Sequence, residues 1–196
     1  MLPPIFESAG YYGRELIAAE VPRVQALFDA HPAYFLATNG RRAKPDEAQV
    51  EFADFPPAHL TFTQRWFAGL FNRDDELIGV AVVVSDLCAA QVWHIALFLV
   101  ATHLHGRGVG SEIFVALEAW MRASGAKWLR LGVVEGSARA ERFWARHGFQ
   151  QVRVRAGVET GGRLNHIRVL VKPLGASGVA EYLALVPRDQ PDSTLA

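Results

Sequence analysis

The stretch VATHLHGRGVGSEI, residues 100–113, limits the possible folds more than any other part of this sequence. Three glycines at alternate positions, Gly106, Gly108 and Gly110, join an apolar run that ends at Val100 to a helix-like sequence. A glycine-rich turn between a strand and a helix can bind an anion, because free backbone N–H groups meet the positive end of the helix dipole there. The sequence therefore predicts a strand, a phosphate-binding turn and a helix, in this order.

Two common phosphate-binding motifs do not fit this turn. A P-loop needs a lysine directly after its last glycine, and Ser111 follows Gly110 instead. A dinucleotide-binding turn has the spacing G-x-G-x-x-G after the first strand, whereas G-x-G-x-G stands here after several strands. A flexible turn that binds nothing is the alternative interpretation.

The rest of the chain predicts a sheet flanked by helices. Runs rich in Val, Ile, Phe and Trp predict a three-stranded antiparallel meander at 65–72, 77–85 and 91–101. Further strands are expected at 15–18, 128–134, 149–158 and 164–171, and helices near 21–28, 113–124 and 137–147. This order of elements indicates a mixed α/β (α+β) layer fold.

One domain accounts for most of the chain. Of the 196 residues, 51% are hydrophobic, which is enough for one sizeable core. We expect residues 1–173 to form this domain and residues 174–196 to form a poorly ordered tail, in which AEYLALV adds at most one short strand. The mixture of Gly, Pro and charge in residues 39–59 predicts a loop around at most one short helix.

Charge and cysteine content argue against several classes of function. Lys plus Arg equals Asp plus Glu, 20 against 20, so no basic surface for nucleic acid or an anionic membrane is expected. The single cysteine, Cys88, forms no internal disulfide, and no Cys/His cluster has zinc spacing, so no metal is expected. Without a signal-peptide pattern or an apolar run of about 20 residues, we expect a cytoplasmic protein.

Two motifs together resemble the GNAT superfamily of acyl-CoA-dependent N-acetyltransferases. They are V-x-x-x-x-H-G-R-G-V-G at 100–110 and S-x-x-A-x-x-F-W-x-x-x-G-F at 137–149. The resemblance covers residues 60–173, and 14–30 more loosely. It implies a single GNAT-like domain with a central mixed, mostly antiparallel sheet that is splayed at the acetyl-CoA site. It also implies acetyl transfer from acetyl-CoA to a primary amine of a small molecule or peptide, and it is compatible with a homodimer.

The resemblance also assigns cofactor-binding residues, with the pyrophosphate on the glycine turn and the pantetheine along the preceding strand. Carried over residue by residue, they are Phe98, Leu99 and Val100 on the strand, His105, Gly106, Arg107, Gly108, Val109, Gly110 and Ser111 in the turn, and Ser137, Ala140, Phe143 and Trp144 in the second motif. Backbone N–H groups near Phe98 and Leu99 are expected to polarise the thioester carbonyl.

Three positions depart from the family pattern. His105 replaces an Arg or Gln, and Ser137 replaces an Asn whose capping role it is expected to keep. Trp144 replaces a Tyr that protonates the departing thiolate, and an indole N–H does not give up a proton usefully. A catalytically silent acyl-CoA-binding regulatory module is therefore the alternative function.

His94 is the candidate general base. Strict alternation along the strand places Val92, His94, Ala96, Phe98 and Val100 on one face, and His94 is the only titratable side chain among them. Its ordinary pKa of about 6.5 suits proton transfer at neutral pH, and several members of the family carry a base at this position. The alternative is a buried histidine bonded to a backbone carbonyl.

The acceptor pocket is less defined by the sequence. Trp66, Phe67 and Trp93 either line an apolar pocket or belong to the core. The acidic residues of 39–59 either attract a cationic amine or form a solvated face.

Overall fold

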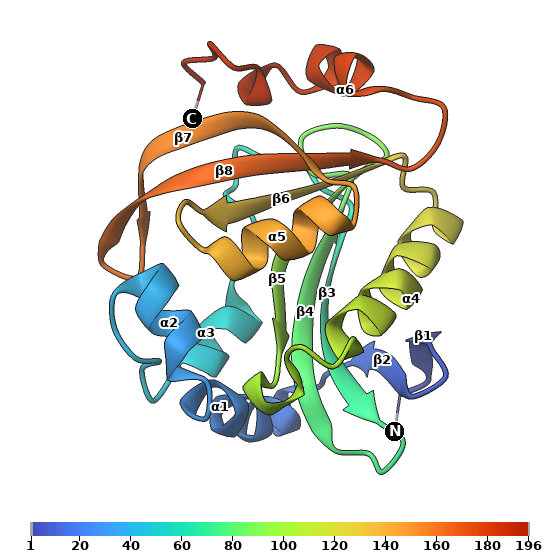
Figure 1. The fold of residues 1–196 in the computed structure, drawn as a ribbon, viewed down its shortest axis with the longest axis vertical. Helices are drawn as coiled ribbons and strands as arrows, with labels where there is room; N and C mark the ends of the chain where they lie inside the picture. The colour runs from blue at the N-terminus through green and yellow to red at the C-terminus, as the bar shows by residue number, and fades with distance from the viewer. Residues whose placement is uncertain (1, 196) are drawn as a thin grey trace.

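The computed structural model describes residues 2–195 and contains one mixed sheet of eight strands covered by helices (Figure 1). The strands are β1 (Pro4–Glu7), β2 (Tyr11–Glu15), β3 (Gln64–Asn72), β4 (Leu77–Ser85), β5 (Val92–Val100), β6 (Trp128–Val134), β7 (Gln150–Thr160) and β8 (Arg163–Pro173). Their order in the sheet is β1-β2-β3-β4-β5-β6-β8-β7. Every neighbouring pair is antiparallel except β5 and β6, which are parallel.

Helices cover both faces of the sheet. They are α1 (Val21–Asp29), α2 (Pro32–Asn39), α3 (Glu47–Ala53), α4 (Val109–Ala123), α5 (Ala138–Arg146) and α6 (Val179–Leu185). Helices α4 and α5 pack on one face, which we call the α4–α5 face. On the opposite face, α1–α3 cover β4 and the later half of β5, whereas α6 covers β6–β8 and the start of β5. The mixed fold and the three-stranded meander that the sequence predicted are confirmed.

Helix α4 shows why the sequence pattern identified this element. Its residues Ile113, Leu117 and Met121 recur every four positions and are at most 1% exposed, so one apolar stripe faces the sheet. Gly125, with φ of 101°, follows its end and takes a left-handed conformation that favours glycine.

The N-terminal region differs from the expectation. The strand expected at 15–18 lies earlier, at Tyr11–Glu15, and residues 18–20 form a short 3₁₀ helix that leads into α1. β1 and α2 were not expected. Helix α2 (PAYFLATN) buries only Phe35, so its sequence lacks the periodic apolar stripe by which a helix is recognised. Within 39–59, the one short helix expected at most is α3.

The C-terminal residues 174–195, which we call the C-terminal segment, are not the poorly ordered tail that was expected. AEYLALV forms part of helix α6 rather than a strand, and residues 187–189 form a 3₁₀ helix. Tyr182 and Val186, four residues apart, are both buried against β6–β8, and this spacing selects a helix over a strand. In Figure 1, α6 is drawn at the top of the view, above β7 and β8.

Helix α2 also connects the two halves of the sheet. Its Phe35 packs beneath β4 and β5, whereas the Thr38 carbonyl accepts hydrogen bonds from Thr160 Oγ1 and Asn165 Nδ2, both at 2.7 Å, in the β7–β8 hairpin. Arg163 of this hairpin donates to the Ala37 carbonyl (3.1 Å), where its charge complements the negative end of the helix dipole. Among the helices of residues 2–195, none has the length and apolar character that crossing a membrane requires.

Candidate active site

A gap opens between β5 and β6 in the middle of the sheet. The two parallel strands pair only over four positions, from Val92 opposite Trp128 to Ile95 opposite Leu131. Beyond these, β5 continues to Val100 and β6 to Val134 without pairing to each other. The splayed sheet that the sequence predicted is therefore present, and the gap starts directly after Ile95.

A β-bulge at Ala96 reverses the facing of β5 at the start of the gap. Leu97 pairs with Val82 and Ile95 pairs with the adjacent Val83, so Ala96 has no partner on β4. One extra residue in a strand moves the side chains before it to the other face of the sheet.

This reversal corrects the predicted arrangement of His94. Phe98 and Val100 face α4 and α5, whereas Leu97 and Leu99 face α1–α3. His94 lies on the face opposite Phe98, next to Val92 and the C-terminal segment. The expectation that His94, Phe98 and Val100 share one face is wrong, because strict alternation does not account for the bulge.

The surroundings of His94 also change its acid–base chemistry. Its Nδ1 lies 3.1 Å from the Arg130 carbonyl and 3.3 Å from Arg130 Nη1. Burial, reinforced by the Arg130 guanidinium, lowers the pKa of His94 to about 3. The ring is therefore neutral at pH 7, and the contact with a backbone carbonyl matches the alternative that the sequence left open.

Two backbone N–H groups of β5 point into the gap. The Ala101 N–H donates to the Ile78 carbonyl at 2.7 Å, so odd-numbered residues of this stretch face β4. Because successive residues of a strand point their N–H groups to opposite edges, Phe98 and Val100 face the gap. The two N–H groups that face the gap are thus those of Phe98 and Val100, whereas the sequence analysis expected those of Phe98 and Leu99. The Leu99 side chain packs toward α1–α3.

The glycine turn presents a row of free backbone donors. Within the described residues, the N–H groups of 106–110 have no hydrogen-bond partner. Gly106 and Gly108 have φ of 76° and 83°, and a Cβ at either would meet nothing within 4 Å. Val109 begins α4 and is buried in the core beneath the turn. Five consecutive free N–H groups at the start of a 15-residue helix form a site for an anionic group.

Side chains add positive charge beside this turn. Arg107 is exposed, and Arg139 of α5 contacts His105 Nδ1. The other ring nitrogen of His105 donates to the Val100 carbonyl at 2.8 Å, so His105 connects β5 to Arg139. The sequence analysis did not single out Arg139, because its proximity to the turn depends on the packing of α5 against β5.

Two serines of the candidate site have different surroundings from those expected. Ser137 precedes α5, but its side chain makes no capping hydrogen bond, and Glu141 instead accepts from the Gly136 N–H at 3.0 Å. The expected capping role of Ser137 is therefore wrong. Ser111 Oγ lies 3.1 Å from Nε2 of His147, the residue that follows α5, so this contact connects the start of α4 to the end of α5.

An aromatic cluster lines the gap on the α4–α5 face. Trp144 is 7% exposed, and its ring centroid lies 5.7 Å from that of Phe98 across the gap. Phe143 stacks on Phe98 at 5.9 Å and supports Gly110, where an added Cβ would lie 3.5 Å from the Phe143 ring. Ala140 packs against the same cluster. Trp144 thus points toward β5 and lies within a packed cluster.

The residues considered for an acceptor pocket divide between the two faces. Trp66 and Trp93 stack at 5.2 Å on the α4–α5 face, and Phe67 is buried on the opposite face. These three aromatic residues therefore belong to the core and do not line a common pocket. In residues 39–59, burial raises the pKa of the Glu51 carboxyl.

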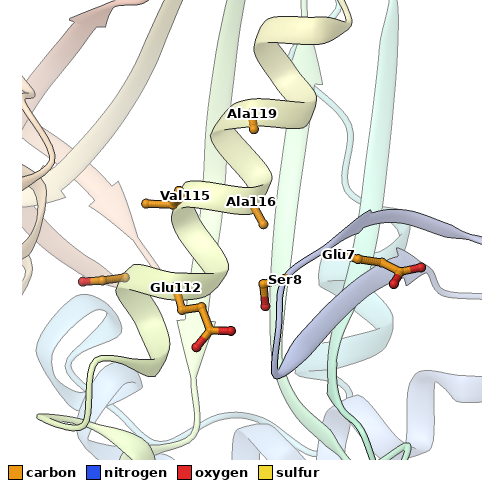
Figure 2. Close-up of a pocket in the computed structure, with 7 residues that line it drawn as sticks. Glu7, Ser8, Glu112, Val115, Ala116 and Ala119 are labelled. Atoms are coloured by element: carbon orange, nitrogen blue, oxygen red, sulfur yellow. The ribbon is translucent and has the colours of Figure 1, made fainter.

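A groove of about 430 Å³ lies outside the gap, between α4 and the β1–β2 hairpin (Figure 2). Its α4 wall is largely aliphatic, with Val115, Ala116 and Ala119, and Glu112 accepts a hydrogen bond from the Gly10 N–H at 2.9 Å. It is separate from the free N–H groups of β5. Residues 2–195 contain no group of three His, Cys, Asp or Glu side chains that could hold a metal ion.

The comparisons with known proteins agree with this geometry. The model of the acetyltransferase (GNAT) family matches residues 24–149, which is more than half of the chain. None of the curated proteins that were compared matches it.

Solved structures share the fold at low sequence identity. An acetyltransferase from Thermus thermophilus is 21% identical, with a TM-score of 0.64 over 84% of this chain and 97% of its own. Spermidine N-acetyltransferase from Vibrio cholerae, solved with CoA and spermine, is 12% identical, with a TM-score of 0.62 over 83% and 95%. An acetyltransferase from Salmonella typhimurium that modifies the N-terminal serine of a 50S ribosomal subunit protein is 13% identical, with a TM-score of 0.67 over 88% and 98%.

Proposed function

The chain belongs to the GNAT acetyltransferase family, and on this basis we propose that it transfers an acetyl group from acetyl-CoA to a primary amine of a small molecule or peptide. The observation that carries the proposal is that two sets of backbone N–H groups without partners lie at the gap between β5 and β6. The N–H groups of Phe98 and Val100 face the gap, and those of residues 106–110 lie at the mouth beside it. Two structural neighbours, one of them acting on a protein N-terminus and one on spermidine, illustrate the range of acceptors.

The glycine turn fits the pyrophosphate of coenzyme A. Its free N–H groups and the α4 dipole supply donors and positive potential, and the absence of side chains at Gly106 and Gly108 allows close approach. Arg107 and Arg139 add charge at the same end. The pantetheine arm would then follow β5 from Val100 toward Phe98.

The reaction would proceed by direct attack. The amine nitrogen bonds to the thioester carbonyl carbon, and the C–S bond breaks. The nitrogen, positively charged after the attack, releases one proton to solvent, and coenzyme A leaves as a thiolate that takes one proton from solvent. The Phe98 N–H would stabilise the negative charge that develops on the carbonyl oxygen. Cys88 has no part in this step, since it lies in the β4–β5 loop, 3.6 Å from Arg188 of the C-terminal segment.

For His94 we propose a different role from the one that its ordinary pKa indicated. A ring with a pKa of about 3 does not take a proton from an ammonium group in the neutral pH range. We propose that the amine reacts in its neutral form and donates a hydrogen bond to Nε2 of His94. The rate should therefore rise with pH toward the pKa of the amine.

One observation favours the alternative, a catalytically silent acyl-CoA-binding module. Trp144 stands where the family has a phenol, and it is packed against Phe98, Phe114 and Phe149 rather than being free in the gap. A silent module would keep the turn and the gap while lacking turnover.

Two measurements test the proposal. Acetyl-CoA should raise the melting temperature, because it binds the folded chain, and free CoA should appear when a panel of amines and peptides is added. Binding without CoA release on any amine would favour the silent module. The absence of binding would contradict both functions.

A further inference from the structure

The C-terminal segment places a carboxylate deep inside the protein. Asp189 is 0% exposed and accepts two hydrogen bonds from Arg130 of β6, at 2.6 Å from Nε and 2.9 Å from Nη2. The Tyr182 hydroxyl donates to the same carboxylate. Arg130 is 7% exposed, so this ion pair lies almost wholly in the interior.

A buried ion pair of this kind is a poor way to add stability. Removing two charges from water costs about as much as their attraction returns, and apolar residues of the same size often stabilise a fold equally well. The pair is therefore more informative for what it holds in place. The third nitrogen of the Arg130 guanidinium, Nη1, lies 3.3 Å from His94 Nδ1.

The main chain of Arg130 fixes the proton on His94. His94 and Arg130 are directly opposite each other on β5 and β6, and the Arg130 carbonyl lies 3.1 Å from Nδ1. A carbonyl only accepts, so a hydrogen bond in this nearer contact places the proton on Nδ1 and leaves Nε2 with a free lone pair, and Arg130 Nη1 then acts on the ring through its charge rather than as a donor to Nδ1. Nε2 has no hydrogen-bond partner in the described residues. It is also absent from the fully buried side-chain atoms without a partner, so it keeps some contact with solvent. It is thus open to a ligand.

We propose that Asp189 is a positioning residue, which holds the Arg130 guanidinium beside His94 and so keeps the imidazole in place with Nε2 directed to the acceptor amine. This inference rests on the proposed function. It makes the C-terminal segment part of the acceptor side of the active site, although Asp189 touches neither substrate. The orienting carboxylate therefore acts through an arginine, rather than directly on the histidine ring.

The charges around His94 support this arrangement. Arg130 approaches from β6, and Asp189 and Arg188 approach from the C-terminal segment. The two guanidinium groups oppose a positive charge on the ring, and Asp189 keeps one of them from becoming an unpaired buried charge. Burial and the two guanidinium groups together outweigh the Asp189 carboxylate, which by itself favours a charged ring, so the imidazole stays neutral.

The test compares Asp189→Asn with a matched control, Trp128→Phe. The first replaces the charge at nearly constant shape. The control removes the hydrogen bond of 3.2 Å from Trp128 Nε1 to the Gly178 carbonyl, which also holds the C-terminal segment on β6 but involves no atom of Arg130 or Asp189. Three quantities are measured for each: the nitrogen NMR shifts of the His94 ring, acetyl-CoA affinity, and kcat and KM for the best amine.

The wild-type ring should show a protonated Nδ1 and a bare Nε2 from pH 8 to pH 5. Asp189→Asn should mix the two tautomers and lower kcat by about ten-fold, less than the roughly hundred-fold expected when the imidazole itself is removed. Acetyl-CoA affinity should stay unchanged, and Trp128→Phe should match the wild type in all three measurements. If Asp189→Asn does not fold, Tyr182→Phe should give a smaller change in the same direction.

Two results would overturn the positioning role: an unchanged tautomer and kcat in folded Asp189→Asn, or an equal change in Trp128→Phe. A wild-type ring that titrates near pH 6.5 would overturn it as well. Failure of the proposed function is distinguishable, because the NMR shifts would then follow the expected pattern while no amine releases CoA.

Discussion

The two ends of the candidate active site are built in different ways. At the glycine turn, the functional groups are backbone N–H donors of five consecutive residues, which have no hydrogen-bond partners within the described residues. At His94, the functional group is one side chain. Arg130 contacts it, and Asp189, which lies 59 positions further along the chain than Arg130, holds the Arg130 guanidinium. The first end is a local product of sequence, and the second depends on tertiary packing.

This difference predicts that substitutions at the two ends of the site have different effects. A change at the glycine turn should affect ligand binding and leave the fold intact, because the turn buries little. A change at the His94 end should affect stability and the chemistry of one ring. The following predictions test this contrast, in order of decreasing effect.

Arg130→Met should have the largest effect, lowering the free energy of unfolding by about 3–5 kcal/mol, because Asp189 is left buried without its partner. The double variant Arg130→Met/Asp189→Leu should recover most of this loss. Urea unfolding measures both. If the single variant were as stable as the wild type, the buried pair would not be the anchor of the C-terminal segment.

Gly108→Glu should weaken acetyl-CoA binding by about a hundred-fold, or ~2.7 kcal/mol, because a carboxylate would meet the pyrophosphate. Gly157→Glu is the matched control, since Gly157 also has positive φ (67°) and open space but lies in β7. Both variants should bear a similar backbone strain of about 1 kcal/mol. Equal CoA affinity in the two folded variants, by calorimetry, would contradict the assignment of the turn.

The stability of the wild type should fall on acidification more steeply than that of His94→Gln. The pKa of His94 is about 3 in the folded state, against an ordinary value of 6.5. Between these values only the unfolded chain binds the proton, so stability falls as pH decreases, by up to about 1.4 kcal/mol per pH unit. Urea unfolding at pH 6.5, 5.5 and 4.5 gives the difference. Parallel curves for the two proteins would show that His94 is not held neutral.

Trp144→Tyr should have the smallest effect. The smaller ring costs about 1 kcal/mol or less if the cluster closes around it, and turnover should rise or stay the same because a phenol then faces the gap. Steady-state CoA release across pH measures this. A silent module would gain no activity from this change. A large drop in turnover, with CoA affinity kept, would assign Trp144 a positive catalytic role.

Local patterns predicted much of the fold. The meander, α4 and α5 were recognised from apolar periodicity, because each buries one regular stripe or face. The glycine turn was recognised from another local signal, its alternate glycines, of which Gly106 and Gly108 adopt the positive φ that glycine favours. Helix α2 lacks such a stripe, and AEYLALV is short and apolar enough to fit either a strand or a helix until β6–β8 supply its partner.

The candidate site was predictable only in part. His94 was found, but its facing depends on a register shift between β4 and β5, which no single-strand pattern contains. Arg130 and Asp189 carried no motif, because an arginine in a strand and an aspartate near a C-terminus are ordinary until packing joins them. Long-range contacts of side chains are the part that the sequence did not reveal.

The bulge at Ala96 has a consequence for how this sequence can change. Its side chain is an exposed methyl group, so an alanine scan would pass over the position and most replacements should be tolerated. Deleting the residue should be tolerated as well. A deletion would join Ile95 directly to Leu97, which restores regular alternation with Val83 and Val82, so His94 and Trp93 would keep their present faces. A chain without the bulge would thus carry its counterpart of His94 three residues before the counterpart of Phe98 instead of four, and the same face would be reached from a shorter strand.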